Sequence, residues 1–187
     1  MSNAPTTPDE RFQYAVDFVL KHEGGLEVNK SDPGGETNYG ISLRFLKDND
    51  ITLNGVRQCS IDDILQLTQD EAKALYKRYF WNRFGYESIN DIFLASKIFD
   101  CAVNMGPKEA HEIAQEALKK LNPSYIVVDG IMGPKTIEAL NDFDKKFPGM
   151  ILNEIKRLSI EFYLNLVKYN AGLSPFLRGW INRANDG

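Results

Sequence analysis

The chain has 187 residues, enough for one ordinary domain or two small halves, and long enough to bury a core without disulfides or a structural metal. With 43% hydrophobic and 26% charged residues, the composition is that of a globular protein and excludes a disordered or collagen-like chain. The net charge of −4 and the lack of a dense Lys/Arg block argue against nucleic-acid binding, and the longest apolar runs are too short for a membrane span.

Helices dominate the predicted elements, and several begin at clear capping signals. Over about 8–22, apolar residues recur every three or four positions after a capping box at Thr7, until two glycines end the run. A second capping box at Thr68 begins an aromatic-rich helix. The other predicted helices cover about 91–104 and 107–121, and two more begin at Pro134 and Pro148.

Residues 24–40 differ from the rest of the chain, because glycines and a proline replace the helical periodicity and indicate a small β-hairpin or loop. The predicted fold is therefore mainly α, with about seven or eight helices. A composition shift near Gly106 divides the chain into two halves, 1–105 and 106–187, which we expect to pack as one compact unit.

The cysteines and histidines do not form a metal-binding pattern. Cys59 and Cys101 stand alone and are predicted to be buried thiols of a reducing compartment. His22 lies beside Glu23 in the chain, whereas His111 is expected on the exposed side of its helix in a structural role. No metal or organic cofactor is predicted.

Glu23 is the main candidate for acid catalysis. It ends the first helix directly before two glycines, and the partial negative charge of the helix end favours the protonated form that a general acid needs. Asp32 and Thr37 follow in the glycine-rich segment. One carboxylic acid that faces a second carboxylate and a hydroxyl offers the groups needed for glycoside hydrolysis.

Five segments together resemble the signature of the glycoside hydrolase family 108 muramidases, which include phage endolysin-like enzymes and secretion-activator proteins. The segments are residues 21–25 (Lys-His-Glu-Gly-Gly), 32–42 (Asp-Pro-Gly-Gly-Glu-Thr-Asn-Tyr-Gly-Ile-Ser), 99–106 (Phe-Asp-Cys-Ala-Val-Asn-Met-Gly), 129–136 (Asp-Gly-Ile-Met-Gly-Pro-Lys-Thr) and 176–183 (Phe-Leu-Arg-Gly-Trp-Ile-Asn-Arg). The resemblance implies a helical, lysozyme-like fold, cleavage of peptidoglycan and the acid role for Glu23. The second half is similar to helical peptidoglycan-binding modules.

The other site candidates each have a structural alternative. Phage-type lysozymes also order Glu, Asp and Thr, but with one more residue between Asp and Thr, so Asp32 and Thr37 either hold a water or simply form the turn. Asp100 and Asn104, one helical turn apart, are candidates for substrate contact or for a core network. The remaining substrate-binding candidates are Asn38, Tyr39 and the aromatic residues Trp81 and Tyr86, which are otherwise core residues.

The predicted function is a muramidase that cleaves the β-1,4 bond between N-acetylmuramic acid and N-acetylglucosamine. A lytic transglycosylase and a non-catalytic peptidoglycan-binding or secretion accessory protein are the alternatives. The expected partner is the glycan strand, without stable membrane insertion. Because no signal peptide is recognisable, we expect synthesis in the cytoplasm and action in the periplasm or at the cell wall after holin-dependent or specialised export, as for a bacteriolytic prophage endolysin.

Overall fold

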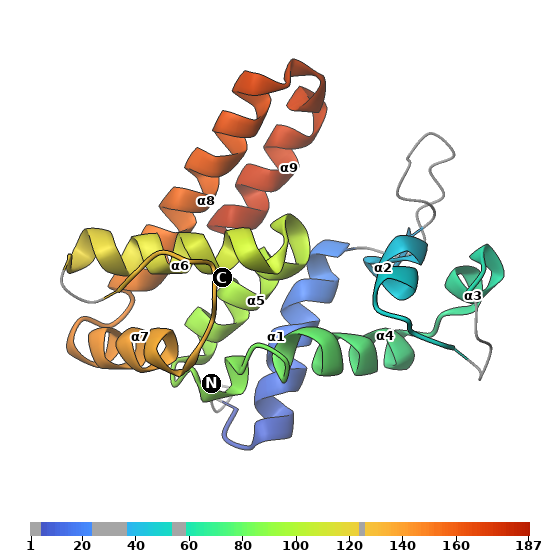
Figure 1. Ribbon diagram of the computed structural model, residues 1–187, viewed down its shortest axis with the longest axis horizontal. Helices are drawn as coiled ribbons and strands as arrows, with labels where there is room; N and C mark the ends of the chain where they lie inside the picture. Colours follow the sequence, from blue (N-terminus) through green and yellow to red (C-terminus); the bar gives the residue numbers. More distant parts are fainter. Residues whose placement is uncertain (1–4, 24–36, 54–58, 124–125) are drawn as a thin grey trace.

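The computed structural model describes residues 5–23, 37–53, 59–123 and 126–187 (Figure 1). These residues form nine α-helices and one two-stranded sheet, which confirms the predicted mainly α fold and is consistent with a lysozyme-like architecture. The helices are α1 (Pro8–Glu23), α2 (Leu43–Asp48), α3 (Ile61–Gln66), α4 (Gln69–Tyr76), α5 (Ile92–Met105), α6 (Pro107–Leu121), α7 (Pro134–Lys146), α8 (Met150–Tyr169) and α9 (Ser174–Asn185). Three shorter helical segments are η1 (Lys77–Trp81), η2 (Tyr86–Ser88) and η3 (Ala171–Leu173).

The sheet is a minimal hairpin of β1 (Thr37–Asn38) and β2 (Ile41–Ser42), in which Thr37 pairs with Ser42. Tyr39 and Gly40 form its turn, both with positive φ, as a two-residue hairpin loop requires. The predicted hairpin region thus contains a hairpin at its end, and residues 24–36 lie outside the described residues. Helices α2 and α3 have six residues each, too few for the periodicity that revealed the longer helices.

Helix α1 begins at the predicted capping box. The amide of Glu10 donates to the Thr7 hydroxyl, and the Glu10 carboxylate accepts from the Thr7 amide at 3.0 Å. The hydrogen bonds that the carboxylate accepts from the backbone amides of Thr7 and Thr6 lower the pKa of Glu10 to about 2. The buried side of the helix, which includes Val16 and Val19, packs on α5, so the helix carries Glu23 at a fixed position at its C-terminal end.

Aromatic side chains fill the core beside α1. Helix α4 continues into the π-helix η1, and the two together bury Tyr76, Phe80 and Trp81. These rings and that of Tyr86 surround Phe99 at centroid distances of 5.7–6.2 Å. The aromatic stretch after Thr68 is therefore core, as helical spacing predicts.

Helix α5 is the centre of the molecule and is buried along most of its length. It packs against α1, α6 and α8. One continuous core contains residues from both sides of Gly106, from Phe12 to Leu158. Cys59 and Cys101 are buried free thiols, as predicted. The residues on either side of Gly106 therefore share one hydrophobic interior.

The segment before α7 is a turn built around the buried side chain of Gln115. Its amide oxygen accepts from the backbone amides of Asp129 and Gly130 at 2.9 and 2.8 Å, and its amide nitrogen donates to the Asp129 carboxylate at 2.8 Å. Gly130 has a φ of +72° and lies tightly against Lys108. The Asp-Gly-x-x-Gly-Pro run thus has a clear structural role.

His111 is buried, contrary to the expectation of an exposed position, because its ring bridges two segments. Its Nδ1 lies 3.0 Å from the carbonyl oxygen of Gly130, which can only accept, so Nδ1 carries the proton. Its Nε2 therefore accepts from the hydroxyl of Tyr86, 2.7 Å away. Burial lowers the pKa of His111, which favours the neutral ring that both contacts need.

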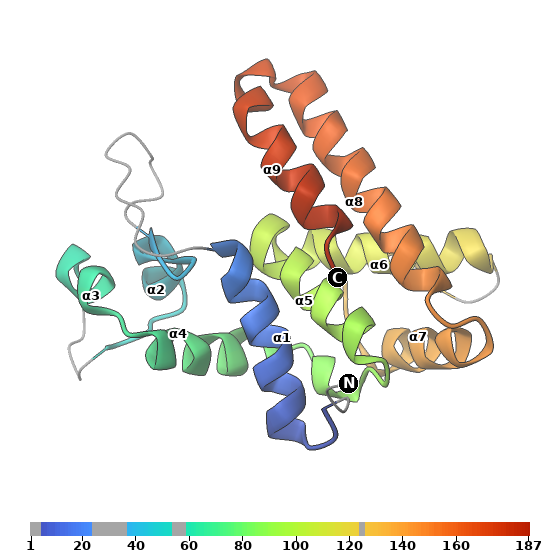
Figure 2. The ribbon, with the colours of Figure 1, turned by 180° about the vertical axis from the view of Figure 1, so that it is seen from behind.

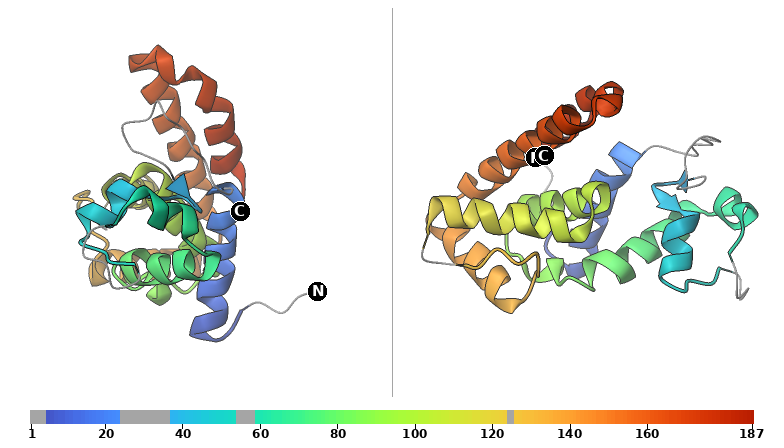
Figure 3. Two further views of the ribbon diagram at one scale, coloured as in Figure 1. Left: turned by 90° about the vertical axis from the view of Figure 1, so that its right-hand side faces the viewer. Right: turned by 45° about the horizontal axis from the view of Figure 1, so that its top comes forward.

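Helices α8 and α9 run side by side as a hairpin whose η3 end projects beyond the other helices (Figures 1, 2 and 3). Its base packs on the body through α6 and α5, next to the C-terminal end of α1. None of the described helices is both long and apolar enough to cross a membrane.

Candidate active site

Glu23, the predicted general acid, lies where the end of α1 meets α9. Its Oε1 is 2.7 Å from Nη2 of Arg183, which α9 supplies. The Glu23 side chain is 17% exposed. The carboxylate is therefore held by a cation on one side and retains some access to solvent.

The hairpin turn closes the other side of Glu23. A methyl group on Gly40 would come within 2.5 Å of both Oε2 of Glu23 and the hydroxyl oxygen of Tyr76. That hydroxyl donates to the carbonyl oxygen of Tyr39 at 2.9 Å, and burial, aided by the Glu23 charge, raises the pKa of Tyr76. The turn fits against the carboxylate only because residue 40 has no side chain.

Arg183 connects Glu23 to two other predicted site residues. Its Nε lies 3.1 and 3.2 Å from the two carboxylate oxygens of Asp100, and its Nη1 donates to Oδ1 of Asn104 at 3.4 Å. Burial opposes the charge of this guanidinium, but Asp100 and Glu23 outweigh it and raise the pKa of Arg183. Arg183 is thus a permanent cation shared by two carboxylates.

Asp100 ties three helices together. Its side chain is only 2% exposed, and besides Arg183 it has Nδ1 of His22 at 3.3 Å, without the geometry of a hydrogen bond. Nε2 of His22 in turn lies 3.0 Å from the carboxylate of Asp186. Lys97 donates to the carbonyl oxygens of Arg183 and Asp186 and so fixes the end of α9. Of the two interpretations of Asp100, the geometry favours the core network that braces the site.

Asn104 faces the same cluster from one turn further along α5. Its amide nitrogen donates to the hydroxyl of Tyr163 at 2.5 Å, and its oxygen accepts from Arg183. The side chain is half-buried. Asn104 is therefore linked to Glu23 through Arg183, and both of its polar side-chain atoms are hydrogen-bonded.

The three candidates of β1 and its turn have different surroundings. Thr37 and Tyr39 are half-buried, and they lie close in the chain to Gly40, which touches Glu23. Asn38 is buried, and its amide nitrogen donates to the carbonyl oxygens of Ile64 and Leu67, at 3.1 and 3.2 Å. Asn38 therefore anchors the hairpin to the end of α3. Asp32 lies outside the described residues.

Trp81 and Tyr86, the aromatic candidates for substrate contact, are placed in the core instead. Their exposed fractions are 1% and 0%. Both rings pack on Phe99, and the Tyr86 hydroxyl is used by His111. Both rings therefore lie in the interior, and neither faces a ligand in this structure.

Three residues of the site were not singled out by the sequence. Gly40 and Arg183 lie within the motifs that carry the family resemblance, but a role for either requires the contact with Glu23. Tyr76 reads as a core aromatic residue, and only its hydroxyl reaches the site. Within the ranges that the structure describes, no group of three or more His, Cys, Asp or Glu side chains could hold a metal ion.

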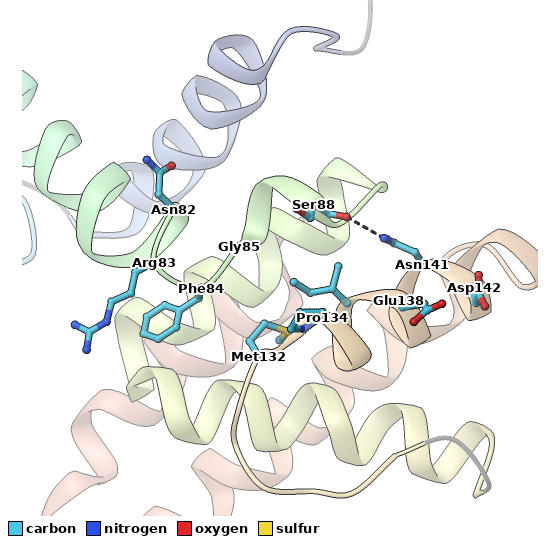
Figure 4. Close-up of a pocket in the computed structure, with 11 residues that line it drawn as sticks. Asn82, Arg83, Phe84, Gly85, Ser88, Met132, Pro134, Glu138, Asn141 and Asp142 are labelled. Carbon is cyan, nitrogen blue, oxygen red and sulfur yellow. Dashed lines mark hydrogen bonds between the residues drawn. The ribbon is translucent and has the colours of Figure 1, made fainter.

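A separate cavity of about 640 Å³ lies away from these residues, between the segment that joins η1 to η2 and helix α7 (Figure 4). Phe84, Met132 and Ile137 contribute apolar surface, and Arg83 and Glu138 contribute charge. Asn141 spans it with a hydrogen bond to the carbonyl oxygen of Ser88. The predicted site residues do not line this cavity, so it is not the candidate catalytic centre.

Two family models match this chain, one in each half. The family model described as "Glycosyl hydrolase 108" matches residues 16–106, and the model described as "Predicted Peptidoglycan domain" matches residues 109–185. The chain therefore contains a glycosyl hydrolase 108 domain. A solved structure titled "Structure of Brucella abortus SagA" is 27% identical, with a TM-score of 0.73, and the match covers 94% of this chain and 90% of that one. No curated protein sequence matches significantly.

The candidate site draws on both matched segments. Glu23, Gly40 and Asp100 belong to the glycosyl hydrolase 108 segment, whereas Arg183 belongs to the peptidoglycan domain segment. Because Arg183 contacts Glu23 directly, the second segment supplies part of the site itself.

Replacing Gly40 by Ala is expected to weaken both stability and activity. The added methyl group would press on Glu23 and Tyr76, and a side chain at positive φ costs about 1–2 kcal/mol. We expect a lower melting temperature and at least about tenfold slower cell-wall digestion. The matched control is Gly85→Ala, which has a similar φ of +67° but meets only Ile137, far from Glu23. Equal losses of activity in both variants would contradict the role of Gly40.

Proposed function

We propose that this protein hydrolyses the β-1,4 bond between N-acetylmuramic acid and N-acetylglucosamine in peptidoglycan, with Glu23 as the general acid. The observation that carries the proposal is the partly exposed Glu23 carboxylate, held between Arg183 and Gly40 in a chain that also matches a peptidoglycan domain. Glu23 would protonate the glycosidic oxygen as the bond breaks and the sugar becomes oxocarbenium-like.

Arg183 would stabilise the charge that this proton transfer creates. As the proton leaves, negative charge develops on the Glu23 carboxylate, 2.7 Å from the guanidinium. Asp100 contacts the guanidinium through both carboxylate oxygens and so compensates much of its positive charge beforehand.

Asp32 and Thr37 would position the attacking water. Thr37 lies on β1, in the hairpin whose turn touches Glu23. A carboxylate and a hydroxyl on the face of the sugar opposite Glu23 would orient a water for inversion at the anomeric carbon. Tyr39 and Asn104 are the proposed substrate contacts that lie nearest to the site, and Asn38 and Asp100 would act by positioning their neighbours.

The two halves, 1–105 and 106–187, would act as one catalytic unit on the glycan strand. The continuous core and the Glu23–Arg183 contact support this proposal. Action on peptidoglycan places the working site in the periplasm or at the cell wall, and we propose holin-dependent or specialised export to reach it.

The decisive experiment is digestion of purified peptidoglycan, followed by mass analysis of the released fragments. We expect reducing N-acetylmuramic acid ends that carry one added water, with inverted configuration at the anomeric carbon. Anhydro ends, lighter by one water, would indicate a lytic transglycosylase instead of a hydrolase. Asp32 and Thr37 would then not be needed for the reaction. Binding to the wall without released fragments would indicate an accessory protein and reject catalysis.

A further inference from the structure

One face of α9 leads from the candidate active site to the projecting end of the α8–α9 hairpin. Phe176, Trp180 and Arg183 follow one another at intervals of four and three residues, and Gly179 is three residues from Phe176 and four from Arg183, so the four share one face of the helix. We call this row the α9 stripe. Arg183, at one end of the stripe, contacts Glu23.

The two aromatic residues of the stripe, Trp180 and Phe176, extend a stack that begins at Tyr163 of α8 and becomes progressively more exposed. Tyr163 and Trp180 stack at 5.2 Å and 24°, and Trp180 and Phe176 stack at 5.8 Å and 26°. Tyr163 is 3% exposed, Trp180 is half-buried and Phe176 is 57% exposed. These separations correspond to offset stacking, and Phe176, at the outer end of the stack, is the most exposed of the three rings.

The stack is continuous with the residues around Glu23. The hydroxyl of Tyr163 accepts from Asn104, and the amide oxygen of Asn104 accepts from Arg183. Arg183 is paired with Glu23. An unbroken series of contacts therefore joins the general acid to the exposed rings.

Gly179 is a second, independent sign of a binding surface. Glycine within a helix is unfavourable relative to alanine, so it normally needs a packing reason. Here no atom lies within 4 Å of the position that a Cβ would occupy. The neighbouring parts of the protein do not require glycine at this position, and the bare backbone beside Trp180 allows another molecule to approach closely.

The charge of α9 is opposite in sign to that of the whole chain. The helix contains Arg178 and Arg183 and no acidic residue, whereas the chain carries a net charge of −4. Arg183 is paired with Glu23 and Asp100, so Arg178, which is exposed, is the cation of α9 that a ligand can reach. An exposed cation on the same helix as exposed aromatic rings suits a ligand that combines carboxylates with flat apolar C–H faces. A peptidoglycan strand has both features.

We infer that the α9 stripe binds the peptidoglycan glycan strand on one side of the cleaved bond. This inference rests on the proposed function, because it takes the strand that Glu23 would cleave as the ligand. Sugar rings stack on the exposed ring of Phe176 and contact the exposed part of Trp180, and the strand passes close to the backbone at Gly179. The projecting hairpin thereby guides the strand toward Glu23.

The test measures co-sedimentation of the full chain with purified peptidoglycan sacculi in the cold, together with the melting temperature. Phe176→Ala is expected to weaken binding about three- to tenfold, the amount that one aromatic stacking contact supplies. Gly179→Ala is expected to raise the melting temperature and yet weaken binding, because the methyl group improves the helix but obstructs the strand. If this face had only a structural role, Gly179→Ala would not raise the melting temperature and weaken binding at the same time.

Two matched controls lie off the stripe. Phe147→Ala removes a similarly exposed ring at the end of α7, and Gly133→Ala fills open space at an extended backbone position. Both should bind sacculi like the wild type. Unchanged binding of Phe176→Ala and Gly179→Ala would overturn the inference, even if reducing ends are released normally. Weaker binding of both, in a protein that releases no fragments, would support the stripe while rejecting the proposed hydrolysis.

Discussion

Replacement of Glu23 by Gln is expected to slow digestion of peptidoglycan at least about a hundredfold while leaving the protein folded. Glutamine has nearly the same shape and can still accept a hydrogen bond from Arg183, but it has no acidic proton to give to the glycosidic oxygen. The rate is measured as reducing ends released from purified sacculi, and the fold is checked by the melting temperature.

The matched control for this variant is Glu161→Gln. Glu161 is an exposed carboxylate of α8 that pairs with Arg157, so it repeats the chemical change away from the site. We expect this variant to digest sacculi at the wild-type rate, since exposed ion pairs contribute little to stability. Near-normal digestion by Glu23→Gln would reject Glu23 as the acid.

Replacement of Arg183 by Met is expected to lower the free energy of unfolding by about 3–5 kcal/mol. The change leaves the buried carboxylate of Asp100 without its main cation. A buried charge that has lost its partner strongly destabilises the folded state. Lys97 lies 4.0 Å from Asp100 and offsets only part of the lost charge. Urea unfolding followed by circular dichroism measures the effect.

A second substitution separates the structural effect of Arg183 from its effect on the site. Asp100→Asn combined with Arg183→Met removes both charges, so much of the lost stability should return. Activity should not return, because Glu23 still lacks its guanidinium partner. Wild-type stability of the single Arg183→Met variant would contradict the buried pair, and recovered activity in the double variant would contradict the role of Arg183 at Glu23.

Features governed by neighbouring residues were predictable from the sequence. The capping boxes at Thr7 and Thr68 form as expected, because cap and acid are three positions apart. The end of the first helix, and with it the position of Glu23, follows from the same local rules. The family resemblance was confirmed by the two matched models.

Features that depend on contacts between distant parts of the chain could not be predicted from the sequence. Arg183 becomes a site residue only when α9 packs beside α1, and no local spacing encodes that contact. The roles of Trp81 and Tyr86 were ambiguous, because an aromatic ring can stack on a sugar or pack in a hydrophobic core. In the structure both rings pack on Phe99 in the core. His111 appeared exposed because its two partners, Tyr86 and Gly130, lie in other segments.

The pairing of α1 with α9 also bears on how activity arises during folding. His22 and Asp186, which meet beside Glu23, are 164 positions apart in the chain. Closing so long a loop carries an entropic penalty that local helix formation does not, and contacts of this kind slow folding. Individual helices can therefore form before the acid has its counterion. Recovery of cell-wall digestion after dilution from denaturant would report the completion of the tertiary structure, later than the helical signal.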